Sequence, residues 1–195
     1  LEDLKSWFEE LVHRYEKWAR LQIEWEQMRD ETIRNLKFPF SYREGQFNLA
    51  ASVYRTIARK KKLFIQAPTG TGKTMAVLYP AVRAMGEGLG EKIFYLTART
   101  ITRTVAEQAF FILKEKGLKF RSVTLTAKEK ICFCEKAECN PQACPYAKGH
   151  FDRVNDAVYD LLKNGGGMGR KEIEEQAEKF QVCPFEFALD LSVWA

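Results

Sequence analysis

Four cysteines are crowded into the stretch "KEKICFCEKAECNPQACPYAKGH". They are Cys132, Cys134, Cys139 and Cys144, and a fifth, Cys183, stands well downstream. Thiolates bind zinc and iron–sulfur clusters. Zinc usually takes Cys-x₂₋₄-Cys pairs, whereas a 4Fe–4S cluster needs four thiolates and accepts irregular gaps. The spacing, which contains no C-x-x-C, leaves both metals open, with buried structural cysteines as a third alternative.

A second group of residues suits phosphate binding. The stretch "APTGTGKT" comprises Ala67, Pro68, Thr69, Gly70, Thr71, Gly72, Lys73 and Thr74. It follows an apolar run and opens a helical pattern, which is the context that a Walker A loop requires. The glycines let backbone N–H groups face the phosphates, Lys73 would reach the β- and γ-phosphates, and Thr74 would bind Mg²⁺. The sequence therefore predicts a site for ATP and Mg²⁺ in which Lys73 and Thr74 carry the catalytic roles.

Hydrolysis needs further acids. A phosphate-loop ATPase uses a Mg²⁺-linked Asp and a water-orienting residue on a later strand. No apolar run ending in Asp-Glu occurs between Thr74 and Ala195, and the chain does not begin with Met. We expect a fragment that binds nucleotide but hardly turns it over by itself.

The elements that must position these groups alternate along the chain. Residues 1–35 predict one long helix with apolar residues every three or four positions, stopped by Pro39. Helical patterns then cover 43–62, 74–88 (in which Pro80 should cause a kink or a break) and 101–117. Short apolar runs at 63–67, 92–96 and 120–126 predict strands. This order indicates an α/β fold with a parallel sheet and crossover helices.

The alternation fails after residue 127. The cysteine stretch, a helix at 151–163, the flexible "NGGGMG" and a helix at 170–180 indicate an insertion. We therefore expect an N-terminal helical connector at 1–37, the first part of the α/β domain at 38–126, a small helical, cysteine-rich insertion at 127–185, and a return helix at 186–195.

The composition excludes few classes of protein. The net charge of +5 suits a polyanionic partner but also an ordinary basic surface. No apolar run is long enough to cross a bilayer, and the N-terminus lacks the features of a signal peptide. We therefore expect a cytoplasmic protein with reduced thiols and no membrane partner.

Several motifs together resemble one family. The order "FPFSYREGQ", "APTGTGKT", "FYLTARTITRTVAEQ", a cysteine insert and "CPFEFALDLSVWA" is similar to the first motor lobe of XPD/DinG-type helicases of superfamily 2, most closely the bacterial DinG-related subgroup. The resemblance covers nearly the whole chain from about residue 38. It implies a RecA-like lobe with an inserted 4Fe–4S domain near the point where DNA strands separate, and a role in DNA repair or replication.

The resemblance also implies site residues. Cys132, Cys139, Cys144 and Cys183 match the cluster ligands, which leaves Cys134 as a non-ligand. Gln46 matches the residue that reads the adenine edge. Thr97, Arg99, Thr100 and Lys128 match positions that contact DNA, although "TART" by itself is equally an ordinary helix N-cap.

The implied partners are single-stranded or forked DNA and the rest of the same polypeptide, namely a second motor lobe and an arch insertion. The competing hypothesis is a non-motor, nucleotide-switched module that binds nucleic acid and holds zinc. His150 could be a zinc ligand in that case.

Overall fold

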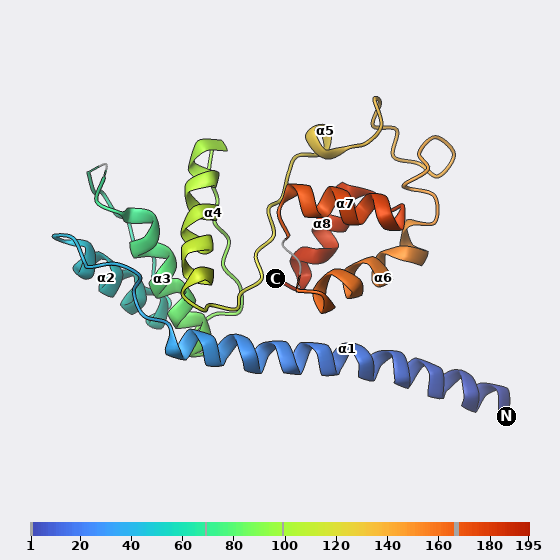
Figure 1. Ribbon diagram of the computed structural model, residues 1–195, viewed down its shortest axis with the longest axis horizontal. Helices are drawn as coiled ribbons and strands as arrows, with labels where there is room; N and C mark the ends of the chain where they lie inside the picture. The colour runs from blue at the N-terminus through green and yellow to red at the C-terminus, as the bar shows by residue number, and fades with distance from the viewer. Residues whose placement is uncertain (1, 69, 99, 166–167) are drawn as a thin grey trace. The chain divides into compact units, whose positions relative to one another are not determined.

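The computed structural model describes residues 2–68, 70–98, 100–165 and 168–195 (Figure 1). The described residues form the helices α1 (Glu2–Asn35), α2 (Gln46–Ala58), α3 (Lys73–Gly86), α4 (Thr100–Glu115), α5 (Lys128–Ile131), α6 (His150–Lys163), α7 (Arg170–Phe180) and α8 (Pro184–Val193). None of them is long and apolar enough to span a membrane.

The chain divides into two compact units. The first, called here the cysteine unit, comprises Leu1–Leu21 and Arg121–Ala195; the second, the phosphate-loop unit, comprises Gln22–Phe120. Helix α1 contributes residues to both. Each unit has its own apolar core, and the phosphate loop and the cysteines belong to different units.

The core of the phosphate-loop unit lies where α3 packs against neighbouring helices. Leu78 and Val82 on α3 and Leu113 on α4 are fully buried. Helix α3 runs through Pro80 without a break, so the interruption expected from the sequence does not occur. The buried side chains on both sides of Pro80 hold the helix together where one backbone hydrogen bond is missing.

The C-terminal end of α1 is capped by side chains of α3. The guanidinium of Arg83 donates hydrogen bonds to the carbonyls of Ile33 and Arg34, both at 2.8 Å, and the Tyr79 hydroxyl donates to the Leu36 carbonyl at 3.1 Å. The last carbonyls of a helix have no partner within the helix. These bonds satisfy them and fix α3 against the end of α1.

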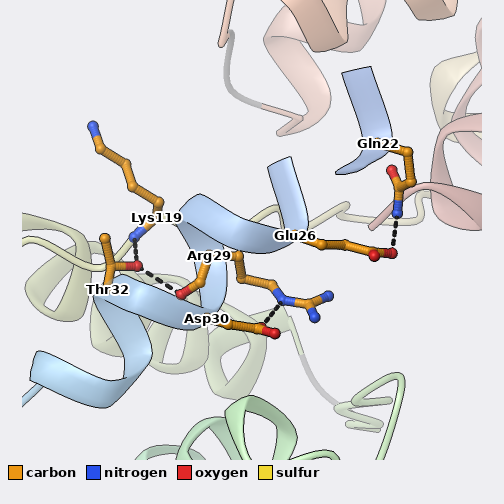
Figure 2. A network of polar contacts seen from close by, with 6 residues as sticks. All are labelled: Gln22, Glu26, Arg29, Asp30, Thr32 and Lys119. Atoms are coloured by element: carbon orange, nitrogen blue, oxygen red, sulfur yellow. Dashed lines mark hydrogen bonds and ion pairs between the residues drawn. The ribbon is translucent and has the colours of Figure 1, made fainter. Parts of the chain in front are cut away.

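A second set of polar contacts joins α1 to the segment that follows α4 (Figure 2). The backbone N–H of Lys119 donates to the Thr32 hydroxyl at 3.0 Å, and this hydroxyl donates to the Arg29 carbonyl at 2.9 Å. Glu26 accepts a bond from Gln22, and Asp30 accepts one from Arg29. The hydroxyl of Thr32 thus holds the backbone at Lys119 close to α1.

The three runs that the sequence predicts as strands are not strands in the described part of the chain. Residues 61–68 and 92–97 have no regular secondary structure, and Phe64 is 94% exposed. Phe94 and Leu96 are also exposed. The third run contributes one parallel bridge, between Val123 and Met168, in which the N–H of Thr124 donates to the Met168 carbonyl at 3.1 Å. The parallel sheet stays a prediction.

The cysteine unit is built around α6, α7 and α8. Its core contains Phe187 and Leu191 of α8, Ile173 of α7 and Ala157 of α6, all completely buried. Trp18 of α1 closes one side of this core, with its ring stacked on that of Trp194 at 4.7 Å between centroids. The helices expected at 151–163 and 170–180 are confirmed, as is the helical return after Cys183.

Candidate nucleotide site and cysteine cluster

The phosphate loop ends at the first residue of α3. Gly70 and Gly72 have φ angles of 83° and 71°, a region that L side chains rarely adopt. Gly72 is the N-cap of α3, so the loop leads into a helix N-terminus, where free backbone N–H groups favour an anion. Thr69 lies outside the described residues. The described part of the loop has the backbone that the motif predicts.

Lys73 folds back over its own loop. Its ammonium donates to the carbonyl of Ala67 at 2.8 Å and to that of Pro68 at 2.5 Å. The Thr71 hydroxyl donates to the same Pro68 carbonyl at 3.0 Å. The cation thus lies at the loop, as its predicted role requires, while the adjacent Thr74 is half-buried in the first turn of α3.

Gln46, the first residue of α2, is 4% exposed, and its side-chain amide binds the phosphate loop. Its Nε2 donates to the Gly72 carbonyl at 3.2 Å, and its Oε1 accepts the N–H of Arg43 at 3.0 Å. In this arrangement the amide that the resemblance assigns to adenine holds the loop. The Arg43 guanidinium also donates to the Gly70 carbonyl. Sequence reasoning did not single out Arg43, although it lies within the quoted "YREGQ".

The predicted DNA-binding segment lies at the beginning of α4. Thr97 is half-buried and precedes the helix, whose first residue is Thr100. Arg99 lies outside the described residues. The helix expected at 101–117 is confirmed as α4, and its N-terminus suits an N-cap and a phosphate contact equally.

Lys128 lies in the cysteine unit and has partners there. Its ammonium is 3.5 Å from Glu186 Oε1 and 4.7 Å from the ring centroid of Phe185. Partial desolvation opposes the charged form, but the neighbouring Cys139 and Glu186 raise the pKa of Lys128. The structure therefore gives this lysine an intramolecular role beside the predicted contact with DNA.

All five cysteines carry free thiols, and two of them lie close together. The sulfurs of Cys134 and Cys144 are 3.8 Å apart. The hydrogen bond with Cys144, together with desolvation and the nearby Cys132, raises the pKa of Cys134 to about 11. Cys139 is exposed, and its thiol donates to the Ala137 carbonyl at 3.6 Å. This pair thus includes Cys134, the residue expected not to be a ligand.

The chemistry of this donor set fits a thiophilic metal or an iron–sulfur cluster. Its positions do not yet form such a site, because no three Cys, His, Asp or Glu side chains within the described ranges lie close enough together to hold a metal ion. Burial raises the pKa of Cys183, which favours the protonated thiol of that residue in the absence of a metal.

His150 is not placed to serve as a zinc ligand. It is 4% exposed, and its Nδ1 accepts a hydrogen bond from the backbone N–H of Cys183 at 3.2 Å. Its Nε2 faces Asp190 Oδ2 at 3.5 Å. Both ring nitrogens thus face groups of α8 or its N-cap, so the imidazole connects α6 to α8.

Comparison with known proteins gives two matches. Residues 48–139 match the DEAD/DEAH box helicase family. The chain is also 43% identical, over 195 aligned residues, to a protein of Methanocaldococcus jannaschii named "Probable ATP-dependent helicase"; the alignment covers 80% of this chain and 30% of that relative. No solved structure matches the chain. This chain is therefore similar to ATP-dependent helicases over a region that contains its phosphate loop.

Proposed function

We propose that this chain is the ATP-binding part of a helicase motor that acts on DNA. The observation that carries the proposal is the phosphate loop: two glycines with positive φ, Lys73 folded over the loop, and α3 beginning at its end, all inside the segment that matches the DEAD/DEAH box helicase family. Backbone N–H groups of the loop and the helix N-terminus would bind the phosphates, and Thr74 would bind Mg²⁺.

The proposal includes a RecA-like sheet. Segments 61–68 and 92–97 precede α3 and α4 in the chain, as strands of such a sheet would, and they expose Phe64, Phe94 and Leu96. Exposed apolar side chains are what the strands of such a sheet present when the layers that cover them are missing. The remainder of a longer polypeptide would supply those layers and the catalytic acids.

The proposed partner is single-stranded or forked DNA. The beginning of α4 offers a helix N-terminus, whose backbone N–H groups bind phosphate. Binding would depend steeply on salt concentration, because Lys and Arg side chains displace counterions from the backbone.

For the cysteine unit we propose a 4Fe–4S cluster held by Cys132, Cys139, Cys144 and Cys183. The group would act as a staple that joins segments with little apolar content. The proposal requires the loop that carries the exposed Cys139 to move toward the other three thiols, because the Cys139 thiol now donates to the Ala137 carbonyl. A zinc site in a non-motor module is the alternative outcome of the metal test.

Nucleotide binding is tested by titrating the chain with a fluorescent ATP analogue in Mg²⁺. We expect Lys73→Ala to weaken binding at least tenfold, or about 1.4 kcal/mol. Lys62→Ala, an exposed lysine shortly before the loop, is the control and should bind as the parent chain does. Equal affinity of Lys73→Ala and the parent chain would refute the proposed site.

The metal is tested by anaerobic purification with measurement of iron, sulfide and zinc. The proposal predicts about four irons per chain, lost in Ser variants of the four proposed ligands and retained in Cys134→Ser. Zinc without sulfide would move the assignment to the zinc-binding module. Loss of iron in Cys134→Ser with retention in Cys139→Ser would exchange these two residues in the ligand set.

A further inference from the structure

The first turn of α6 binds backbone groups of two separate segments of the cysteine unit. His150 is the first residue of this helix, and its Nδ1 accepts the N–H of Cys183 at 3.2 Å. Cys183 is in turn the N-cap of α8. The His150 side chain therefore fixes the backbone of Cys183, the N-cap residue of α8, whose own side chain is a thiol.

The imidazole has a defined orientation. Since Nδ1 accepts a bond, the ring proton of neutral His150 belongs on Nε2. This nitrogen is buried and has no hydrogen-bond partner among the described residues, because the 3.5 Å to Asp190 Oδ2 exceeds the normal range. Buried donors without a partner are rare and unfavourable. The hydrogen bond from Cys183 to Nδ1 is thus formed even though Nε2 of the same ring forms no hydrogen bond with the described residues.

Arg153 lies one turn further along the same helix. Its Nε donates to the Phe180 carbonyl at 3.0 Å, and its Nη2 donates to the carbonyls of Lys148 at 2.7 Å and Gln181 at 2.6 Å. Lys148 follows Cys144 by four residues, and Gln181 precedes Cys183 by two. One guanidinium therefore joins the two segments that carry these cysteines.

The local backbone is adapted to this arrangement. Gly149, the N-cap of α6, has a φ of 68°, and a Cβ at that position would lie 2.5 Å from Nη1 of Arg153. Gln181 has a φ of 54°, which is uncommon for a residue other than glycine. Its carbonyl is one of those that Arg153 binds, so the guanidinium stabilises this conformation.

We propose that His150 and Arg153 form a clamp that positions Cys183 beside the Cys144 segment, so that both thiols are presented to one metal site. The inference rests on the proposed metal-binding function of the insertion and adds two positioning residues to it. Neither residue is a ligand: one fixes the backbone N–H of Cys183 and the other fixes the carbonyls that precede it.

The first test uses the metal-free, reduced 195-residue chain and follows alkylation of each cysteine by iodoacetamide with mass spectrometry. In His150→Gln the acceptor at the Nδ1 position is lost, and Cys183 should react about fivefold faster, as expected for one lost hydrogen bond. In His150→Asn the amide oxygen stands where Nδ1 stood, and the rate should return to that of the parent chain. Arg153→Met should accelerate Cys183 in the same way.

Cys139 provides the internal control, because it is exposed and its thiol donates to the Ala137 carbonyl, which is not a group that the clamp binds. Its rate should be the same in every variant, and far-UV circular dichroism should show that each variant is folded. An unchanged Cys183 rate in folded His150→Gln and Arg153→Met would overturn the clamp. Equal acceleration in the Asn and Gln variants would overturn the role of Nδ1.

The second test separates the clamp from the metal. Iron, sulfide and zinc are measured in the same variants after anaerobic purification, together with the visible absorption spectrum. If the parent chain holds no metal, the proposed metal function fails while the alkylation rates still decide the clamp. If the parent chain holds metal, His150→Gln should hold less and His150→Asn as much as the parent; equal content in all three would overturn the clamp's role in metal binding.

Discussion

The side-chain amide of Gln46 donates a hydrogen bond to the carbonyl of Gly72, with 3.2 Å between nitrogen and oxygen. It joins the N-terminus of α2 to the N-cap of α3, and so it couples two helix ends at the phosphate loop. The contact leaves no room for a side chain at Gly72, where a Cβ would lie 2.3 Å from Gln46 Nε2.

Gly72→Ala should therefore weaken nucleotide binding. The new Cβ must displace the buried Gln46, and it would also stand on a backbone with a φ of 71°. We expect a loss of at least tenfold in affinity, or about 1.4 kcal/mol, measured by titration with a fluorescent ATP analogue. Gly88→Ala is the matched control, because its φ is 73° and a Cβ there meets nothing within 4 Å. It should destabilise the chain by about 1 kcal/mol and leave the affinity unchanged; equal affinities of both variants would contradict the steric argument.

Gly86→Ala should destabilise the phosphate-loop unit by overpacking. A Cβ at Gly86 would lie 2.3 Å from Cγ2 of Ile33, in the contact between α3 and the end of α1. We expect a loss of about 1–3 kcal/mol in the free energy of unfolding, measured by urea denaturation. Gly90→Ala, where a Cβ meets nothing within 4 Å, should change it by less than about 0.5 kcal/mol. Combining Gly86→Ala with Ile33→Ala should cost less than the sum of the two changes, and strict additivity would refute the clash.

Trp18→Ala should destabilise the cysteine unit. The indole stacks on Trp194 and meets the ring of Tyr159 edge-on at 5.2 Å between centroids. Its removal should reduce the free energy of unfolding by roughly 3 kcal/mol and change the near-UV circular dichroism. Tyr15→Ala, less than one turn earlier on α1 and 73% exposed, should change it by less than about 0.5 kcal/mol. Similar losses in both variants would show that α1 contributes through helix propensity alone.

Asp160 should make the cysteine unit sensitive to acid. Hydrogen bonds from Gln176, Lys179 and Asn164 lower the pKa of this carboxyl. Its stabilising contribution is therefore complete above the unfolded pKa of about 3.9 and is lost as the pH falls through the lower folded value. Melting temperatures between pH 7 and pH 3 should fall more steeply for the parent chain than for Asp160→Asn. Parallel curves would show that the network contributes nothing to the pH dependence.

The helices were predictable because their patterns are long and their ends are marked. The helix expected at 1–35 is α1, and the one expected at 170–180 coincides with α7. The break expected at Pro80 does not occur, since packing around α3 outweighs one missing hydrogen bond. The runs at 63–67 and 92–96 form no strand within the described residues, and the sheet stays a prediction, because pairing depends on partners distant in sequence, which a local pattern does not contain.

The candidate site was predictable where the backbone itself is the functional element. "APTGTGKT" specifies positive φ angles and a helix start, and both are present. The side-chain partners were not predictable: the contacts of Gln46 with Gly72 and of His150 with Cys183 join residues 26 and 33 positions apart. Spacing also cannot tell which thiols approach each other, as the proximity of Cys134 and Cys144 shows.

Segments 61–68 and 92–97 bear on whether the isolated chain associates with itself. The first exposes Phe64, the second exposes Phe94 and Leu96, and neither has regular secondary structure. Exposed apolar segments that are not paired within a sheet are templates for pairing between chains. Light scattering of the isolated chain should therefore rise with protein concentration, and co-expression with the polypeptide proposed above to cover these segments should suppress this association.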